Sequence, residues 1–294
     1  MEQVWTIGSV LQWTSQRFAQ NGFEQPRLEA EVLLGHALGK NRVKLYVDYV
    51  QPLTSGELAA YRELVRERLR GVPVAHLTGK KEFMSLSFKI NGDVLIPRPE
   101  TELLVETAAS LARTVIEGRD IFIADVGTGS GVIAICLGRF LPGARVLGID
   151  ISPAALEVAG ENARLLGVDD RVRFREGDLL GPLLREESGV DMITANLPYI
   201  PTGDIPLLQV QVRGYEPVLA LDGGGDGLEL YRRLIPEAVL VLRPGGYLVA
   251  EIGADQGQQA QGLFRPELWS EVGIRPDYSG RDRVLVACRR DERG

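Results

Sequence analysis

The fold is decided by the stretch IFIADVGTGSG at residues 121–131, in which an apolar segment of strand character runs into three alternating glycines. Gly127, Gly129 and Gly131 let the backbone turn sharply and let a ligand lie against it without interference from a Cβ atom. Dinucleotide-binding folds space such glycines as G-x-G-x-x-G, with the pyrophosphate at the N-terminus of the following helix. Val132 occupies the sixth position here. The loop therefore favours a ligand without a pyrophosphate, such as S-adenosylmethionine.

Strands and helices alternate around this loop, which predicts an α/β fold with a doubly wound, seven-stranded, mostly parallel sheet. Apolar segments predict strands at residues 121–126, 145–150, 172–175, 191–195, 247–252, 271–276 and 283–288. Helices are predicted at residues 101–117, 132–140, 153–166, 228–241 and 255–265. No helix separates the last two strands, so they are expected to form an antiparallel edge pair. Residues 197–227 are expected to form a long loop.

The chain before residue 101 is predicted to form two further parts. Residues 1–81 have helical periodicity, with proline at 26, glycine at 39 and a capping box from Thr54 to Glu57. They predict a helical bundle. Residues 82–100 are predicted to be a β-hairpin linker, because strand-like segments flank Asn91-Gly92, the strongest short hairpin signal. Residues 101–294 then form the α/β domain.

Composition narrows the class of protein. The 294 residues include two cysteines and two histidines, which excludes a disulfide framework and makes a structural zinc site improbable. There is no run of 18 apolar residues and no signal-peptide pattern at the N-terminus, so we expect a cytoplasmic protein without a membrane partner. No metal site is expected.

The net charge of −7 is unevenly distributed along the chain. Residues 1–85 carry 11 Lys/Arg and 9 Asp/Glu, whereas residues 86–294 carry 22 and 31. The acidic larger part disfavours a broad nucleic-acid-binding face. The mildly basic smaller part leaves room for a macromolecular partner.

Two acidic positions extend the predicted ligand site. Asp150 ends the strand that follows the glycine loop, 19 residues after Gly131, where a carboxylate can accept both ribose hydroxyls of an adenosine. Because nicotinamide enzymes place an acid similarly, this residue indicates an adenosine ribose without naming the cofactor. Asp178 and Leu179 follow the third strand of the α/β domain, where they can accept the adenine amino group and pack on the ring.

The segment Ala195-Asn196-Leu197-Pro198-Tyr199 follows the fourth strand and indicates the reaction. Ligands of open α/β sheets bind beyond the carboxyl ends of the strands, so this segment is expected over the same crevice as the glycine loop. The Asn196 side-chain oxygen and a nearby backbone carbonyl can both accept N–H bonds from a planar amino group. Tyr199 can hold a flat group by stacking. The pattern favours methylation of an amino group conjugated to a carbonyl or a ring.

These motifs resemble those of a known family. Asn196-Leu197-Pro198-Tyr199 is similar to the [DN]-P-P-[YFW] motif of amino-group methyltransferases. Further stretches resemble the release-factor glutamine methyltransferases of the HemK/PrmC type: LIPRPETE at 95–102, VGTGSG at 126–131, GIDISPAAL at 148–156, YEP at 215–217, ALDGG at 220–224 and PGG at 244–246. The resemblance covers nearly the whole chain.

The resemblance implies a seven-stranded Rossmann-like methyltransferase domain and S-adenosylmethionine as cofactor, with no metal. The implied cofactor residues are Gly127, Thr128, Gly129, Ser130, Gly131, Asp150, Asp178, Leu179 and Asn196. It implies that Asn196, Leu197, Pro198 and Tyr199 hold the glutamine side chain of the Gly-Gly-Gln loop of class 1 peptide chain release factors, whose side-chain nitrogen N5 receives the methyl group. Asn196 and the Leu197 carbonyl would accept the amide hydrogens, Pro198 would fix the turn, and Tyr199 would pack on the amide.

The resemblance extends to the outer parts of the chain. Residues 98–101 resemble a segment that closes over the cofactor side, and residues 1–81 become the expected substrate-recognition domain of a monomer. Leu197 stands where the family usually has a first proline, which removes a fixed φ but keeps a carbonyl acceptor. We interpret it as a tolerated variant.

Two other classes of protein stay open at the level of the sequence. One is a DNA or RNA amino-base methyltransferase, which uses the same Asn-x-Pro-Tyr geometry on a flipped base. The acidic charge of residues 86–294 argues against direct nucleic-acid binding. The other is a non-catalytic adenosine-binding protein with a degenerate site, suggested by Leu197. A nicotinamide oxidoreductase is disfavoured by Val132.

Overall fold

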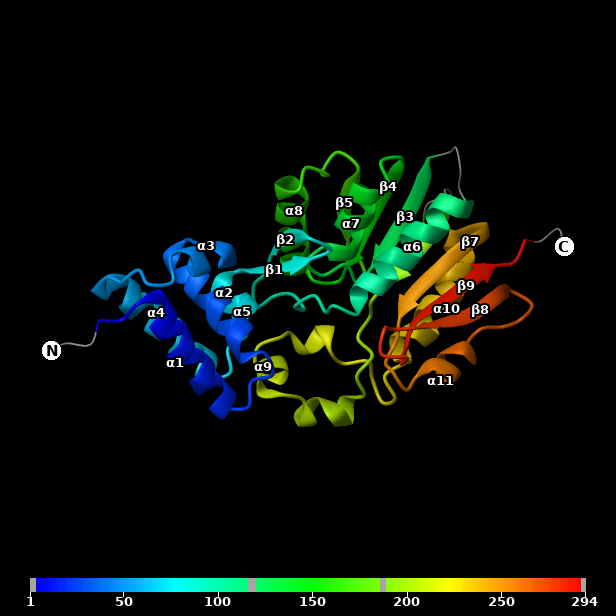
Figure 1. The fold of residues 1–294 in the computed structure, drawn as a ribbon. Helices are drawn as coiled ribbons and strands as arrows, with labels where there is room; N and C mark the ends of the chain where they lie inside the picture. The colour runs from blue at the N-terminus through cyan, green and yellow to red at the C-terminus, as the bar shows by residue number, and fades with distance from the viewer. Residues whose placement is uncertain (1–3, 116–119, 186–188, 292–294) are drawn as a thin grey trace. The chain divides into compact units, whose positions relative to one another are not determined.

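The computed structural model describes residues 4–115, 120–185 and 189–291 and divides the chain into two compact units. The first unit comprises Met1–Lys80 together with Gln209–Tyr215. The second comprises Lys81–Leu208 together with Glu216–Gly294. Figure 1 labels the helices and strands of both units.

The first unit is helical, as the sequence predicts. Its elements are α1 (Ile7–Gln20), α2 (Pro26–Leu38), α3 (Arg42–Val47), α4 (Ser55–Leu69), α5 (Val74–Thr78) and, from a distant part of the chain, α9 (Val210–Arg213). The capping box before α4 is present, because the Thr54 hydroxyl accepts from the Glu57 backbone N–H and the Glu57 carboxylate accepts from the Thr54 N–H. The two short helices α3 and α5 were not predicted.

The segment Gln209–Tyr215 packs on the helical unit although its neighbours in sequence belong to the sheet unit. Arg68 is buried at 3 % exposure and donates to Gln211 Oε1 at 2.8 Å and to Glu29 Oε2 at 2.7 Å. Its guanidinium also lies 4.1 Å from the ring centroid of Phe23. The predicted loop 197–227 therefore contains α9 and two 3₁₀ turns, η1 (Thr202–Leu207) and η2 (Val218–Ala220).

The second unit contains the predicted seven-stranded sheet. Its strands are β3 (Ile121–Val126), β4 (Ala144–Asp150), β5 (Val172–Glu176), β6 (Val190–Ala195), β7 (Leu242–Glu251), β8 (Trp269–Pro276) and β9 (Asp282–Arg289). They lie in the order β5-β4-β3-β6-β7-β9-β8. Strands β3 to β7 are parallel, and β9 is antiparallel to both β7 and β8. The predicted antiparallel edge pair is confirmed.

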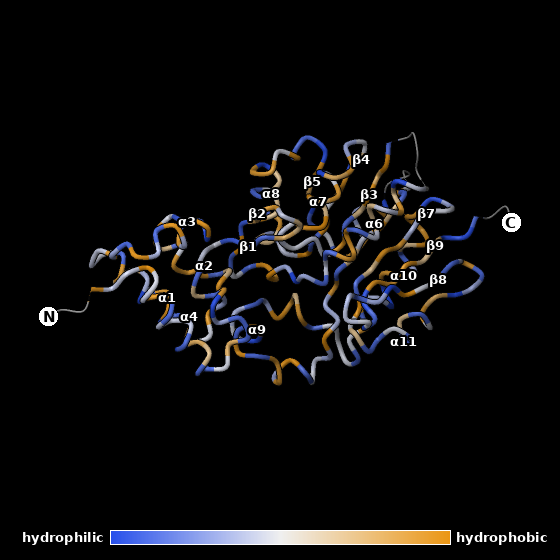
Figure 2. Tube along the Cα trace, in the orientation of Figure 1, coloured by the Kyte–Doolittle hydropathy of each residue, from blue (hydrophilic) through white to orange (hydrophobic). Residues whose placement is uncertain are grey.

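Helices cover both faces of this sheet (Figure 1). They are α6 (Thr101–Val115), α7 (Val132–Phe140), α8 (Pro153–Leu165), α10 (Glu229–Val241) and α11 (Gly257–Gln261). α7 contacts both α6 and α8, whereas α10 shares its core with alternate residues of the strands such as Ile193 and Leu248. Hydrophobic colour follows the central strands in Figure 2, in keeping with a sheet buried on both faces. The end of the predicted helix 101–117 lies outside the described residues.

The predicted hairpin linker exists, but its turn was placed wrongly. The strands are β1 (Lys80–Phe83) and β2 (Leu86–Lys89), so the turn lies at Met84-Ser85 and not at Asn91-Gly92. Met84 and Ser85 have positive φ values of 49° and 61°, and the Met84 N–H donates to Glu102 Oε1 at 2.7 Å. A tertiary contact therefore stabilises a turn that the local sequence does not predict. The predicted second strand at residues 94–96 is irregular in the structure.

Candidate active site

Strand register brings the predicted residues to one edge of the sheet. In β3, Val126 pairs with Ile149 of β4 and with Ala195 of β6, and Ala195 pairs in turn with Ala250 of β7. The residues that directly follow these positions therefore lie side by side at the carboxyl ends of four adjacent strands. They are Gly127, Asp150, Asn196 and Glu251.

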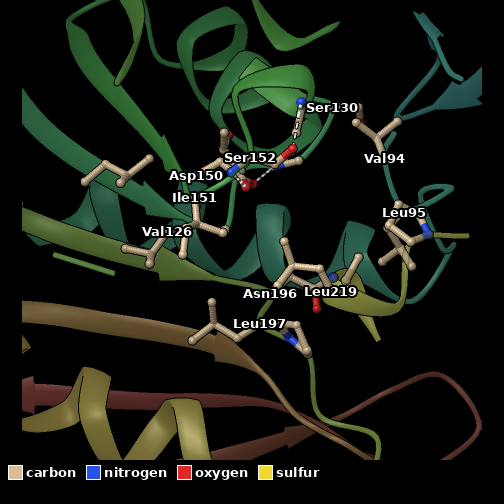
Figure 3. A pocket seen from close by; sticks show the side chains of 18 of the residues that line it. Val94, Leu95, Val126, Ser130, Asp150, Ile151, Ser152, Asn196, Leu197 and Leu219 are labelled. Carbon is tan, nitrogen blue, oxygen red and sulfur yellow. Dashed lines mark hydrogen bonds between the residues drawn. The ribbon is translucent and has the colours of Figure 1, made fainter. Parts of the chain in front are cut away.

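A cavity of about 320 Å³ opens at this edge, which is within the usual size range of ligand pockets, about 300–1,000 Å³. Figure 3 shows Asp150 and Asn196 entering it from different strands, with Val94 and Leu95 at another side. Every predicted cofactor residue except Gly131 lines it, as do Leu197 and Pro198. The segment 98–101, which was expected to close over the cofactor, contributes Arg98 and Thr101, and Pro97 lines the cavity beside it.

The glycine loop has a backbone that only glycine adopts without strain. Gly127, Gly129 and Gly131 have φ values of 70°, 54° and 82°. A Cβ atom on Gly127 would lie 2.9 Å from Leu197 Cδ2, and one on Gly131 would lie 3.0 Å from Ile135 Cδ1. Gly131 therefore allows close packing behind the loop, while Gly127 and Gly129 border the cavity. The loop presents open backbone to a ligand.

Asp150 organises the loop from the end of β4. Its Oδ2 accepts the Gly129 N–H at 2.8 Å, and its Oδ1 accepts the Ser152 N–H at 2.9 Å (Figure 3). A carboxylate has about four acceptor positions, so both oxygens keep capacity for two hydroxyl groups. This arrangement fits the ribose of an adenosine.

The third predicted cofactor segment follows β5. Asp178 is exposed, and its Oδ2 accepts from Arg233 Nη2 at 2.5 Å. Leu179 is buried and has a positive φ of 47°. The ion pair offsets the carboxylate's charge at the cavity rim, and Leu179 supplies an apolar wall for a ring.

Asp125 is a buried acid behind the glycine loop. Its carboxylate accepts from the Thr128 hydroxyl at 2.6 Å and from the Thr194 hydroxyl at 2.8 Å, and Thr194 is its register partner on β6. Burial raises the pKa of Asp125 to about 6, although both threonine hydroxyls act in the opposite direction. The residue ties the loop to the strand that carries Asn196.

Asn196 and Leu197 leave β6 at the cavity. Asn196 Nδ2 donates to Thr101 Oγ1 at 3.2 Å, which leaves Oδ1 as an acceptor on the other side of the amide. Leu197 is 4 % exposed, and its N–H donates to the Tyr231 hydroxyl at 3.4 Å. A proline at position 197 has no N–H to make this bond.

Tyr199, in contrast, is not among the described residues that line the cavity. Its hydroxyl donates to Glu251 Oε1 at 3.4 Å, and its carbonyl accepts from Gln256 Nε2 at 2.9 Å. Burial and, after it, the neighbouring Glu251 carboxylate raise the pKa of Tyr199 to about 12. The phenol therefore stays protonated and remains a donor near neutral pH.

Three residues near the cavity were given no role by the sequence, although Glu216 stands in the quoted YEP stretch. Asn162 of α8 donates to the Ser130 carbonyl at 2.9 Å and bonds both backbone groups of Lys89, so it joins the glycine loop to the hairpin. Glu216 is buried and accepts from Arg98 Nη2 at 2.6 Å and from the Ile96 N–H at 3.3 Å. Glu251 ends β7. The sequence signal that could have identified Glu251 is an acidic residue at the end of a buried strand.

No group of three or more His, Cys, Asp or Glu side chains is arranged to hold a metal ion within the described ranges. None of the helices described has the length and hydropathy needed to span a bilayer.

Comparisons with known proteins agree with both units. A family model described as the PrmC N-terminal domain matches residues 9–79, and a methyltransferase domain model matches residues 119–265. A release factor glutamine methyltransferase of Moorella thermoacetica is 47 % identical over 98 % of this chain and 100 % of its own length. One of Geobacter sulfurreducens is 43 % identical over 96 % of each chain.

Among solved structures, a methyltransferase from Pyrococcus furiosus matches with a TM-score of 0.53 at 17 % identity. The match covers 77 % of this chain and 98 % of that one. At this identity the likeness concerns the fold alone, which agrees with the predicted Rossmann-like architecture.

Proposed function

The chain belongs to the release factor glutamine methyltransferase family, and from this premise we propose that it methylates a glutamine side chain of class 1 peptide chain release factors. The acceptor is the amide nitrogen N5 of the glutamine in their Gly-Gly-Gln loop. The observation that carries the proposal is the single cavity bordered by the glycine loop, Asp150 and Asn196. A methyl donor and an amide acceptor can meet there.

The residues present fit S-adenosylmethionine. The positive-φ glycines expose backbone to the ligand, Asp150 accepts the ribose hydroxyls, and Asp178 with Leu179 borders the adenine. When bound, S-adenosylmethionine supplies an electrophilic methyl group and leaves as S-adenosylhomocysteine. The chain itself needs only to orient the two reactants, which can contribute about 7–11 kcal/mol to lowering the barrier.

Asn196 and Leu197 form the amide site. The Asn196 Oδ1 and the Leu197 carbonyl accept the two amide hydrogens of the glutamine, which directs the nitrogen lone pair towards the methyl group. Pro198 keeps the preceding residue extended, and Tyr199 supports the segment through its bonds with Glu251 and Gln256. The glutamine nitrogen is poorly nucleophilic because its lone pair is delocalised. Two acceptors on its hydrogens favour a more pyramidal nitrogen.

Leu197 is compatible with an active site. Its buried side chain packs against the glycine loop, and its N–H bonds Tyr231, so packing and a hydrogen bond fix the segment in place of a proline ring. This argues for a working site over a degenerate adenosine-binding protein.

The helical domain, residues 1–81, is proposed to recognise the release factor. Four large apolar side chains in or just after α3 are more than half exposed: Val43, Tyr46, Val47 and Val50. Exposed apolar side chains in a cluster are typical of protein-binding surfaces. We place the protein in the cytoplasm as a monomer that makes no direct contact with nucleic acid, and residues 82–100 as the linker to the domain of residues 101–294.

One labelling experiment tests these assignments. The purified chain is incubated with labelled S-adenosylmethionine and, in separate reactions, with release factor, DNA and RNA. We expect label only in the release factor, with mass spectrometry placing one methyl group on the Gly-Gly-Gln glutamine. Label in a nucleic acid would support the base methyltransferase. Cofactor binding without any transfer would support the non-catalytic alternative.

A further inference from the structure

Glu251 is a buried acid beside the amide site with one unused oxygen. It is 1 % exposed and lies next to Asn196 because Ala250 and Ala195 are register partners. Its Oε1 accepts from the Tyr199 hydroxyl, but its Oε2 has no hydrogen-bond partner among the residues that the structure describes. Buried carboxylates are rarely retained without a reason, since burial disfavours the charged form.

The amide of Asn196 must keep one orientation for the proposed reaction. A rotation of the side-chain amide by 180° would exchange Oδ1 for Nδ2 and present a donor where the substrate needs an acceptor. In the structure Nδ2 donates to Thr101 Oγ1 at 3.2 Å. Thr101 is 2 % exposed and begins α6, so solvent does not compete for its hydroxyl.

Thr101 accepts from Asn196 only while its own hydroxyl hydrogen points elsewhere. A hydroxyl can donate or accept, whereas a carboxylate only accepts. Burial raises the pKa of the Glu251 carboxyl above its ordinary value and Glu100 adds to this, whereas Thr101, Arg283 of β9 and Tyr199 act in the opposite direction. The unpartnered Oε2 of Glu251 is the buried acceptor to which the Thr101 hydrogen can turn, and this leaves the Thr101 lone pair for Asn196.

We propose that Glu251 is a positioning residue for methyl transfer, which acts through the hydroxyl of Thr101 to hold the Asn196 amide with Oδ1 towards the substrate. The inference rests on the proposed function of the cavity. Glu251 does not border the cavity among the described residues, so it reaches the substrate through neighbouring side chains, and Thr101 with Asn196 is the proposed route.

The substitution Glu251→Gln reverses the direction of this chain of hydrogen bonds with little change in volume. The new amide can donate to Thr101, whose hydroxyl then donates to Asn196 and favours the rotated amide. The Glu251 backbone carbonyl keeps its bond from the Tyr231 hydroxyl, so the end of β7 is retained. We expect kcat to fall about 10- to 100-fold, by analogy with the loss of partners that orient the ligands of a metal site.

Thr101 offers a matched pair of variants. Thr101→Val removes the hydroxyl at nearly constant shape, and we expect the same loss of kcat. Thr101→Ser keeps the hydroxyl, and we expect it to retain most of the activity. Asp191→Asn is the control for loss of a buried acid, because Asp191 is 2 % exposed at the opposite end of β6. It should lower stability without changing kcat.

The decisive measurement is a double-mutant cycle on kcat for release factor, with S-adenosylmethionine affinity measured by calorimetry for each variant. If Glu251 acts through Thr101, the double variant loses no more than the larger single loss, and the affinity stays within about threefold of the wild type. Additive losses, an unaffected Glu251→Gln protein, or loss of cofactor affinity in every variant would overturn the inference. A wild-type protein that binds the cofactor but leaves the glutamine unmethylated would overturn the proposed function and this inference with it.

Discussion

Alanine substitutions at three glycines distinguish the cost of backbone strain from effects on cofactor binding and on the amide site. Gly127, Gly129 and Gly167 have similar φ values of 70°, 54° and 65°. Their surroundings differ: a Cβ on Gly127 would lie 2.9 Å from Leu197 Cδ2, one on Gly129 would meet only a backbone oxygen at 4.0 Å, and one on Gly167 would meet no described atom within 4 Å. Gly129 borders the cavity, whereas Gly167 follows α8.

The expected free energies follow from these contacts. The left-handed conformation costs a residue with a Cβ about 1–2 kcal/mol, and this applies to all three variants. Carbon atoms pack best at about 3.5–4.0 Å, so Gly127→Ala must also displace the buried Leu197 by roughly 0.5–1 Å. Overpacking of this kind costs about 1–3 kcal/mol more. Gly127→Ala should therefore lower the free energy of unfolding by about 2–5 kcal/mol, against about 1–2 kcal/mol for the other two.

Denaturant unfolding, calorimetry and methyl transfer distinguish the variants. Gly167→Ala should keep normal cofactor affinity and turnover, which makes it the control for strain. Gly129→Ala should weaken S-adenosylmethionine binding about tenfold or more, equivalent to ~1.4 kcal/mol, because its methyl group enters the cavity. Gly127→Ala should lose turnover beyond its loss of affinity, because Leu197 precedes Pro198 in the amide site. Normal cofactor affinity in Gly129→Ala, or equal stability of Gly127→Ala and Gly167→Ala, would refute this reasoning.

Three further substitutions test single residues. Asn196→Ala should lower methyl transfer about 10²- to 10³-fold, as removal of one hydrogen-bonding group from an oxyanion hole does, with cofactor affinity near normal by calorimetry; unchanged turnover would reject the amide site. Asp150→Ala should weaken cofactor binding first, and an unchanged dissociation constant would reject its ribose role. Asp125 has a folded-state pKa of about 6 against an ordinary 3.8, so its native form binds more protons and stability should fall as the pH rises from about 4 to about 6. Asp125→Asn should remove up to about 3 kcal/mol of that fall in denaturant unfolding, and identical pH profiles would contradict the assignment.

Much of the fold was predictable because its signals are local. The capping box at Thr54, the proline at 26 and the glycine at 39 each mark a helix end within a few residues, and the helices begin and end there. The strands of the parallel sheet are short apolar segments between turn residues, so their existence follows from composition. The rule that ligands bind at carboxyl ends of strands then placed the glycine loop and Asn196 over one cavity.

The features that were missed depend on contacts between distant residues. The hairpin turns at Met84-Ser85 because Glu102 accepts the Met84 N–H, while Asn91-Gly92, the better turn sequence, is not used to join strands. Residues 209–215 belong to the helical unit because buried Arg68 bonds Gln211, a pairing across 143 positions of sequence. Periodicity cannot reveal either contact.

Glu251 shows why the chemistry of this site depends on strand register as well as on motifs. A slip of one residue between β6 and β7 would move Glu251 by about 3.3 Å and turn its side chain to the other face of the sheet. The register of β7 is held on its other side by β9, where Glu251 pairs with Val284 and Arg283 donates to the Ile252 carbonyl at 3.1 Å. The antiparallel strands β8 and β9 therefore have a role beyond forming the edge of the sheet. They fix the position of an acid beside Asn196, so substitutions in β9 that leave the cavity lining intact can still reach the amide site.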